Sequence, residues 1–117
     1  MDTHTIIDRR TFNELKETMG AGFVSEIIDT FNLETGRLIE QLRQALAEDD
    51  AVSFARLAHA IKSSSASLGA LVFSQQAREL EMLGKANDLT GASPKLEKFA
   101  ADFARVTRCL EEMSDEP

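Results

Sequence analysis

Tryptophan and tyrosine are absent from this sequence, and its aromatic content consists of seven phenylalanines. Few planar side chains are therefore present to stack on nucleic-acid bases. Cysteine is almost absent too: Cys109 is the only one, so a disulfide within the chain is impossible. Because Cys109 lies in an apolar helical pattern, we expect a buried, inert thiol and assign it no redox role.

Basic charge is also scarce. The 13 lysines and arginines face 20 aspartates and glutamates, and the formal net charge is −7 at pH 7. Such a chain is repelled by a phosphate backbone, so we expect no nucleic-acid partner. Long apolar runs are missing as well, both the roughly 20 residues that a membrane helix needs and the shorter run of a secretory signal. We therefore expect a cytoplasmic protein that is not bound to a membrane.

Strand patterns are absent, because no sustained period-two alternation bounded by turn residues occurs, whereas helical periodicity runs through almost the whole chain. The fold class is therefore predicted to be all-α. A length of 117 residues and a hydrophobic fraction of 43% fit one modest core. We predict a single domain over residues 1–117, with a structured core at about 7–113.

Capping residues and glycines mark the predicted helices. A short first helix is expected from its N-cap Asp8 to Met19, where the Gly-Ala-Gly segment at 20–22 ends it. One long amphipathic helix is then expected from Phe23 to about Glu48. Its apolar positions recur at helical spacing: Phe23, Ile27, Ile28, Phe31, Leu38, Leu42 and Leu46.

Three further signals place the remaining helices. Asp50 is suited to cap a helix that ends near residues 67 and 68, where Gly69 can adopt a left-handed conformation. The next amphipathic helix ends at about Gly84, and Ser93, followed by proline, is expected to cap the last one. Four substantial helices with short connections pack most simply as an antiparallel up-down four-helix bundle, here with a short extra N-terminal helix.

The helix that Asp50 caps carries the residue of most chemical interest. Its apolar side chains gather on one stripe, and His59 projects from nearly the opposite side, toward solvent. The neighbours of His59 on the helix surface are Ala55, Arg56, Lys62 and Ser63, with Ala66 two turns on. The sequence therefore predicts an imidazole above small side chains and between two cations.

Two interpretations of this surface stand side by side. A largely uncharged imidazole is nucleophilic at the ring nitrogen without a proton, so His59 could accept a phosphoryl group whose charge Lys62 would partly neutralise. Exposed histidines are also ordinary, and Lys62 and Arg56 could simply keep a helix face soluble. Ser65, on the inner stripe, fits close helix packing, whereas Ser63 is compatible with either interpretation.

Other chemistries have less support. Metal binding needs several converging ligands, yet His4 is the only other histidine and no metal-ligand spacing of His, Cys and Glu occurs. Hydrolysis by a serine needs an oxyanion hole, and the middle of a helix has no free amides to form one. The sequence contains no glycine-rich phosphate loop, so nucleotide binding has no support. We therefore expect no metal and no cofactor on this chain.

The segment AHAIKSSSASLGA, residues 58–70, resembles the His-x-x-Lys-Gly signature of the histidine-containing phosphotransfer (HPt) domain of multistep two-component phosphorelays, with the small residues and the Gly-Ala pair that follow it. The resemblance covers roughly residues 7–113. It implies that His59 is the phosphoacceptor, Lys62 the lysine beside it and Gly69 the break after the site helix. One position departs: Ser63 stands where the family usually has a glycine that leaves room for the phosphoryl group.

The resemblance implies a phosphorelay intermediate. His59 would accept a phosphoryl group from the phospho-aspartate of a receiver domain and pass it to the aspartate of another. No kinase or phosphatase activity of its own is expected, and Mg²⁺ would belong to the receiver. The expected partners are response-regulator receiver domains and a hybrid sensor histidine kinase, which would dock around His59 on Ala55, Arg56, Ser63 and Ala66.

From its length we expect a free-standing protein, and from its single phosphoryl site and acidic surface a monomer. Two alternatives remain open. The first is a helical scaffold that docks receiver or kinase domains without being phosphorylated, and Ser63 makes such a pseudo-HPt conceivable. The second is an enzyme acting on a small molecule, which would need a concave pocket beside His59.

Overall fold

The computed structural model describes residues 6–116, and these residues form α-helices without any strand. The helices are α2 (Arg9–Met19), α3 (Ala21–Ala47), α4 (Ala51–Ser67), α5 (Leu71–Lys85) and α6 (Ala92–Ser114). The predicted all-α class is therefore confirmed. None of these helices is both long and apolar enough to span a lipid bilayer.

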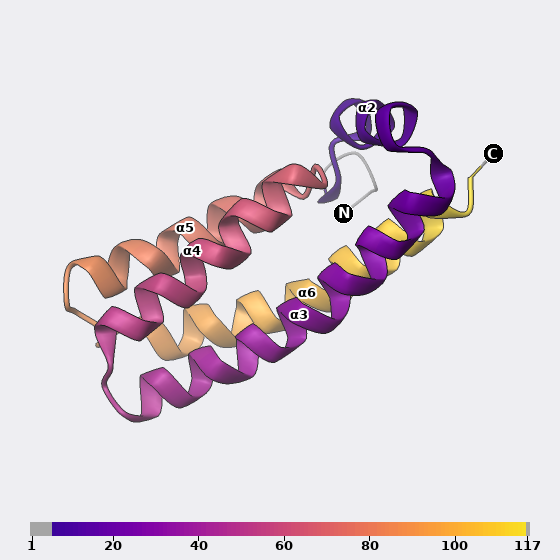
Figure 1. Ribbon diagram of the computed structural model, residues 1–117. Coiled ribbons are helices and arrows are strands. Elements are labelled where there is room, and N and C mark those ends of the chain that lie inside the picture. Colours follow the sequence, from indigo (N-terminus) through magenta and orange to yellow (C-terminus); the bar gives the residue numbers. More distant parts are fainter. Residues whose placement is uncertain (1–5, 117) are drawn as a thin grey trace.

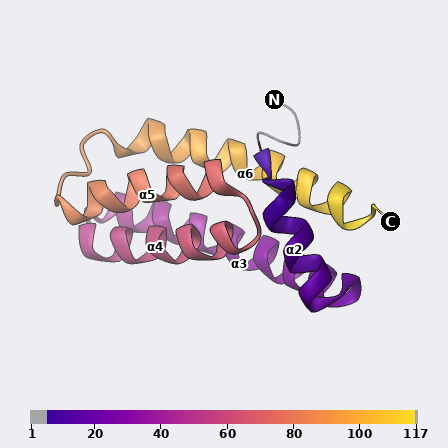
Figure 2. The same cartoon turned by 90° about the horizontal axis from the view of Figure 1, so that it is seen from above.

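Helices α3 to α6 form an antiparallel four-helix bundle (Figures 1 and 2). Each helix packs against the next in the chain, and α6 closes the ring by packing along α3. The α3–α6 pair extends beyond the end of the α4–α5 pair, and α2 lies over this extension (Figure 1). The molecule measures 45 × 25 × 18 Å. The predicted bundle with a short additional helix near the N-terminus is confirmed.

Helix α2 is attached to the turn between α4 and α5. Asp8 caps α2 as predicted, since its carboxylate accepts a hydrogen bond from the Thr11 amide at 3.2 Å. The Asp8 amide in turn donates to the Gly69 carbonyl at 2.8 Å. Gly69 has a φ of +87°, and a Cβ atom there would lie 2.9 Å from the Asp8 carbonyl oxygen. Both the left-handed turn and the close approach of α2 therefore require glycine at this position.

Three details of the predicted helices are wrong. Gly20, with a φ of +87°, makes the first break alone, and α3 already begins at the next residue. Helix α6 begins at Ala92, so Ser93 lies in its first turn and does not cap it. Proline is tolerated after it because first-turn amides have no partner within the helix. Phe23, assigned to the inner stripe of α3, is 48% exposed, because it lies in the first turn of α3, at the end that extends beyond the α4–α5 pair (Figure 1).

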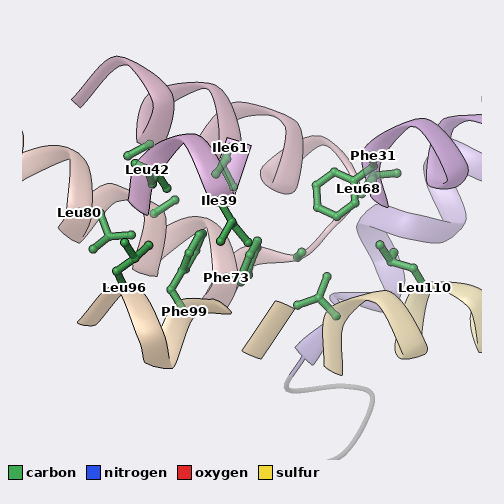
Figure 3. Packing of buried hydrophobic residues seen from close by; sticks show 14 of the residues in the cluster. Phe31, Ile39, Leu42, Ile61, Leu68, Phe73, Leu80, Leu96, Phe99 and Leu110 are labelled. Carbon is green, nitrogen blue, oxygen red and sulfur yellow. The ribbon is translucent and has the colours of Figure 1, made fainter. Parts of the chain in front are cut away.

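The core lies between the four long helices, and phenylalanines are prominent in it (Figure 3). The rings of Phe73 and Phe99 stack with their centroids 4.1 Å apart. Cys109 is buried, as expected. Other buried side chains labelled in Figure 3 are Phe31, Ile39, Leu42, Ile61, Leu68, Leu80, Leu96 and Leu110. This packing fixes the rotation of each helix about its axis, and so determines which side chains of α4 and α5 can meet.

Candidate phosphoacceptor site

The core anchors α4 by one face and leaves His59 on the other. Ala58, Ile61 and Ser65 are fully buried. The Ser65 hydroxyl donates to the Ile61 carbonyl at 2.6 Å, so this small polar side chain is satisfied within its own helix. The side chain of His59 is 58% exposed. The predicted placement of His59 on the solvent side of the helix is therefore confirmed.

Two contacts hold α5 close to α4 beside His59. At Gly84 the helices approach so closely that an added Cβ atom would lie 2.8 Å from both the Ala51 carbonyl oxygen and the Ala55 Cβ. Nearer the other end of α5, the Ser74 hydroxyl donates to the Lys62 carbonyl at 2.8 Å. Together they bring one polar face of α5 to His59.

Glu81 projects from this face of α5 to His59. Its Oε2 lies 2.7 Å from Nδ1 of His59, and its Oε1 lies 2.6 Å from Nζ of Lys62. A second ammonium group, that of Lys85, lies 3.4 Å from Oε2. The side chain of Glu81 is only 3% exposed. One buried carboxylate is therefore shared by the imidazole and two lysines.

The ionisation of Glu81 determines which nitrogen of His59 is free. Burial alone would raise the pKa of Glu81, but hydrogen bonds from Lys62 and His59, the charge of Lys62 and a hydrogen bond from Lys85 together lower it to about 2. The carboxylate is thus ionised at neutral pH and can only accept hydrogen bonds. Nδ1 of a neutral His59 must then be the protonated nitrogen, which leaves a lone pair on Nε2. This assignment of the tautomer follows from the hydrogen-bond network.

The other predicted site residues lie on α4 around His59. Arg56, Ser63 and Ala66 are exposed, whereas Ala55 is half-buried against α5. The structure joins Lys62 to His59 through Glu81, but it does not join Arg56, whose nearest hydrogen-bond partner is the Ser53 hydroxyl at 3.4 Å. The imidazole is therefore flanked by one closely coupled cation of α4, not two.

Glu81, Gly84 and Lys85 belong to this site, although no sequence pattern assigns them to it. They lie more than 20 positions after His59, and helical periodicity does not say which face of one helix meets another. One signal was present. Glu81 directly follows Leu80 on the buried side of α5, where an ionised residue is rare unless it is paired. An acidic residue on a core-facing stripe therefore indicates a partner on the neighbouring helix.

The described residues include no group of side chains that is arranged to bind a metal ion. Within residues 6–116, no three His, Cys, Asp or Glu side chains are placed to hold a metal ion. Glu81 is already hydrogen-bonded to His59 and Lys62 through its two oxygens. The arrangement is suited to presenting a nucleophilic nitrogen, with cations beside it, to a group delivered from outside.

A groove of about 510 Å³ opens two turns along α4 from His59, between α2, α3 and the end of α4. It is mainly apolar, and Glu26 and Glu34 are the charged residues in its lining. The remaining lining residues are Leu15, Phe23, Ile27, Thr30, Phe31, Thr35, Ser64, Ser67 and Leu68. His59 is not among them, so the groove does not provide the pocket that a small-molecule enzyme would need at the imidazole.

Comparisons with known proteins agree with this geometry. The crystal structure of histidine-containing phosphotransfer protein B (HptB) from Pseudomonas aeruginosa is similar, with a TM-score of 0.87, 27% identity, and coverage of 93% of this chain and 94% of that one. A rice protein, provisionally described as a histidine-containing phosphotransfer protein, shares the fold at 23% identity, with a TM-score of 0.84 and coverage of 97% and 84%. No curated protein sequence matches. A family model for the Hpt domain matches residues 26–116, and the chain therefore belongs to the Hpt domain family, with a role in histidine phosphotransfer in phosphorelays.

Proposed function

We propose that His59 accepts a phosphoryl group from the phospho-aspartate of one receiver domain and passes it to the aspartate of another. The observation that carries the proposal is the 2.7 Å contact between Nδ1 of His59 and the buried, ionised Glu81. This contact orients the ring and leaves the lone pair on Nε2. Because the side chain of His59 is 58% exposed, a partner's active site can approach it.

The transfer needs no proton from the attacking nitrogen. The Nε2 lone pair attacks the phosphorus, the bond from phosphorus to the aspartate oxygen breaks, and its electron pair leaves with the carboxylate. The ring retains its Nδ1 proton and gains a positive charge, which Glu81 stabilises through its hydrogen bond. Transfer to the second receiver is the reverse of these bond changes. Lys62, beside Glu81, is placed to attract the equatorial oxygens of the moving group.

We propose that the receiver domain, and not this chain, supplies the metal ion for the transfer. We assign Mg²⁺ to the receiver domain, and we propose no cofactor and no kinase or phosphatase activity for this chain. The proposed donors and recipients are a hybrid sensor histidine kinase and response-regulator receiver domains. We further propose that the protein acts as a cytoplasmic monomer, since a single exposed imidazole is sufficient for the transfer.

Docking is proposed on the outward face of α4, continuing into the groove. From His59, the exposed residues Ser63 and Ser67 lead along α4 to the groove, about 12 Å away at 1.5 Å per residue. Small side chains on this path let a partner surface lie close to the helix. Ser63 is exposed, so its hydroxymethyl group narrows the approach to His59 without closing it.

The test is incubation with receiver domains that carry an aspartyl phosphate, in the presence of Mg²⁺, followed by intact-mass measurement. We expect the wild type to gain one phosphoryl group that is labile to acid and stable to base, His59→Gln to gain none, and the control His4→Gln to behave like the wild type. An adduct that persists on His59→Gln would disprove His59 as acceptor.

The scaffold alternative is tested by the same samples. A wild type that binds receivers but takes no phosphoryl group from any of them would favour a docking module, and Ser63 is the observation behind that possibility. Ser63→Gly then separates two cases. If glycine restores transfer, the chain is a silenced acceptor; if it does not, the chain is a scaffold.

A further inference from the structure

The charges around Glu81 are not balanced before phosphorylation. When the ring of His59 is in the neutral form that can attack phosphorus, one carboxylate faces two ammonium groups, those of Lys62 at 2.6 Å and Lys85 at 3.4 Å. The cluster therefore carries one net positive charge. A single lysine would already neutralise Glu81, so the function of the second lysine needs an explanation.

Phosphorylation of His59 balances the cluster. The transferred group adds one net negative charge, because the phosphoryl oxygens carry two negative charges and the ring becomes positive. With both lysines present the phosphorylated cluster is neutral. Without Lys85, the cluster of Glu81, Lys62 and phosphorylated His59 would carry one net negative charge. The phosphoryl group and the buried carboxylate would then repel each other without a second cation to compensate.

The two lysines are placed for different tasks. Lys62 lies one turn after His59 on the same helix, and its side chain is 28% exposed. Its ammonium group can therefore reach both Glu81 and the oxygens of a phosphoryl group bonded to Nε2 of His59. Lys85 lies one turn after Glu81 on α5, with its side chain 62% exposed. It contacts Oε2, the oxygen that also accepts from His59.

We propose that Lys85 is a positioning residue of the phosphorylated state: when Lys62 turns to the phosphoryl oxygens, Lys85 remains as the counter-ion of Glu81 and keeps this carboxylate hydrogen-bonded to the charged ring. The inference rests on the proposed function. Its consequence is that Lys85 raises the stability of phosphorylated His59 relative to the donor, while the unphosphorylated site does not depend on it.

The experiment phosphorylates His59 without a partner, using phosphoramidate as donor, and measures the ratio of phosphorylated to free protein at fixed phosphoramidate and ammonia concentrations. The variant is Lys85→Gln and the conservative variant is Lys85→Arg. Lys95→Gln is the matched control, because Lys95 is an exposed lysine of α6 that forms no salt bridge with any residue in the described part of the chain. Nitrogen-15 NMR of the His59 ring reports the tautomer of each unphosphorylated protein.

We expect Lys85→Gln to lower the ratio about threefold, the effect of a typical partly exposed ion pair, and Lys85→Arg and Lys95→Gln to match the wild type. The difference should shrink as salt rises to about 1 M, where the Debye length is about 3 Å. Nδ1 should remain protonated in unphosphorylated Lys85→Gln, since Lys62 still holds Glu81. A purely structural lysine would not produce this salt dependence.

Two results would overturn the inference while leaving the proposed function intact. One is a ratio for Lys85→Gln equal to that of Lys95→Gln. The other is loss of the Nδ1-protonated tautomer in unphosphorylated Lys85→Gln, which would show that Lys85 already positions Glu81 in the resting site. Failure of the wild type to take a phosphoryl group on His59 from either phosphoramidate or receivers would instead overturn the proposed function, and this inference with it.

Discussion

The properties of His59 depend on a residue of another helix. An exposed histidine without partners exchanges its proton between two nitrogens and rotates freely, whereas Glu81 fixes both the tautomer and the ring orientation at 2.7 Å. The side chain of Glu81 is only 3% exposed, and Lys62 holds its other oxygen, Oε1, at 2.6 Å, so the carboxylate is itself fixed in place. Nε2, the nitrogen without a proton, therefore belongs to a ring that is held in one orientation and is 58% exposed.

The ionisation of Glu81 predicts a specific dependence of stability on pH. Its pKa is lowered from 4.5 to about 2 in the folded protein, so the unfolded chain binds a proton first as the pH falls. The stabilisation is fully present above pH 4.5 and is lost between 4.5 and about 2. The free energy linked to this difference is about 3 kcal/mol at most.

Urea unfolding of the wild type and of Glu81→Gln at several pH values between about 2 and 6 checks this prediction. The free energy of unfolding of the wild type should fall relative to that of the variant by about 3 kcal/mol across this range. Glu79→Gln, an exposed acid of the same helix, is the control and should keep the steep dependence of the wild type. A parallel course of the wild type and Glu81→Gln would contradict the pairing.

At the scale of the helices, the site depends on the spacing between α4 and α5. Gly84 has no φ requirement, and its importance lies only in space, since a Cβ atom would lie 2.8 Å from backbone and side-chain atoms of α4. Gly84→Ala must push the helices apart. We expect a loss of stability of about 1–3 kcal/mol from overpacking, together with a longer and weaker contact between Glu81 and His59.

Thermal unfolding and the rate of phosphoryl acceptance measure these two effects of Gly84→Ala. Gly22→Ala is the matched control, because Gly22 lies in a helix and an added Cβ atom meets nothing within 4 Å. Alanine there should stabilise the protein slightly, since it is the better helix former. Unchanged acceptance in Gly84→Ala, despite a lowered melting temperature, would show that the spacing serves stability alone.

Helices and caps could be predicted from the sequence because their signals are local. Apolar periodicity, the caps Asp8 and Asp50 and the turn at Gly69 depend on residues a few positions apart, and the two caps and the turn are confirmed. The prediction of Ser93 as an N-cap was wrong, because a serine before a proline is compatible both with a cap and with the first turn of a helix. The link from His59 to Glu81 could not be predicted in this way, since it arises from the packing angle and register of two helices, which periodicity does not fix.

At the scale of the whole molecule, two features lie along one surface. His59 lies at the middle of α4, and the groove of about 510 Å³ is lined by residues of α2, of α3 and of the last turn of α4. The groove offers apolar contact area with two carboxylates in its lining, whereas the surface around His59 offers small side chains. A receiver domain that covered both the groove and the surface around His59 would bind through the apolar groove and react at the imidazole.

This division of roles predicts that Phe23 contributes to docking and not to chemistry. Phe23 lines the groove and is 48% exposed, so Phe23→Ala removes apolar contact area while leaving the buried core intact. We expect the rate of transfer from a receiver at low concentration to fall about tenfold, the effect of one apolar anchor worth about 1.4 kcal/mol. Phosphorylation by phosphoramidate, which needs no docking, should be unchanged. Leu33→Ala is the control, because Leu33 is 68% exposed on the same helix but does not line the groove; equal rates for the two variants would place the docking surface elsewhere.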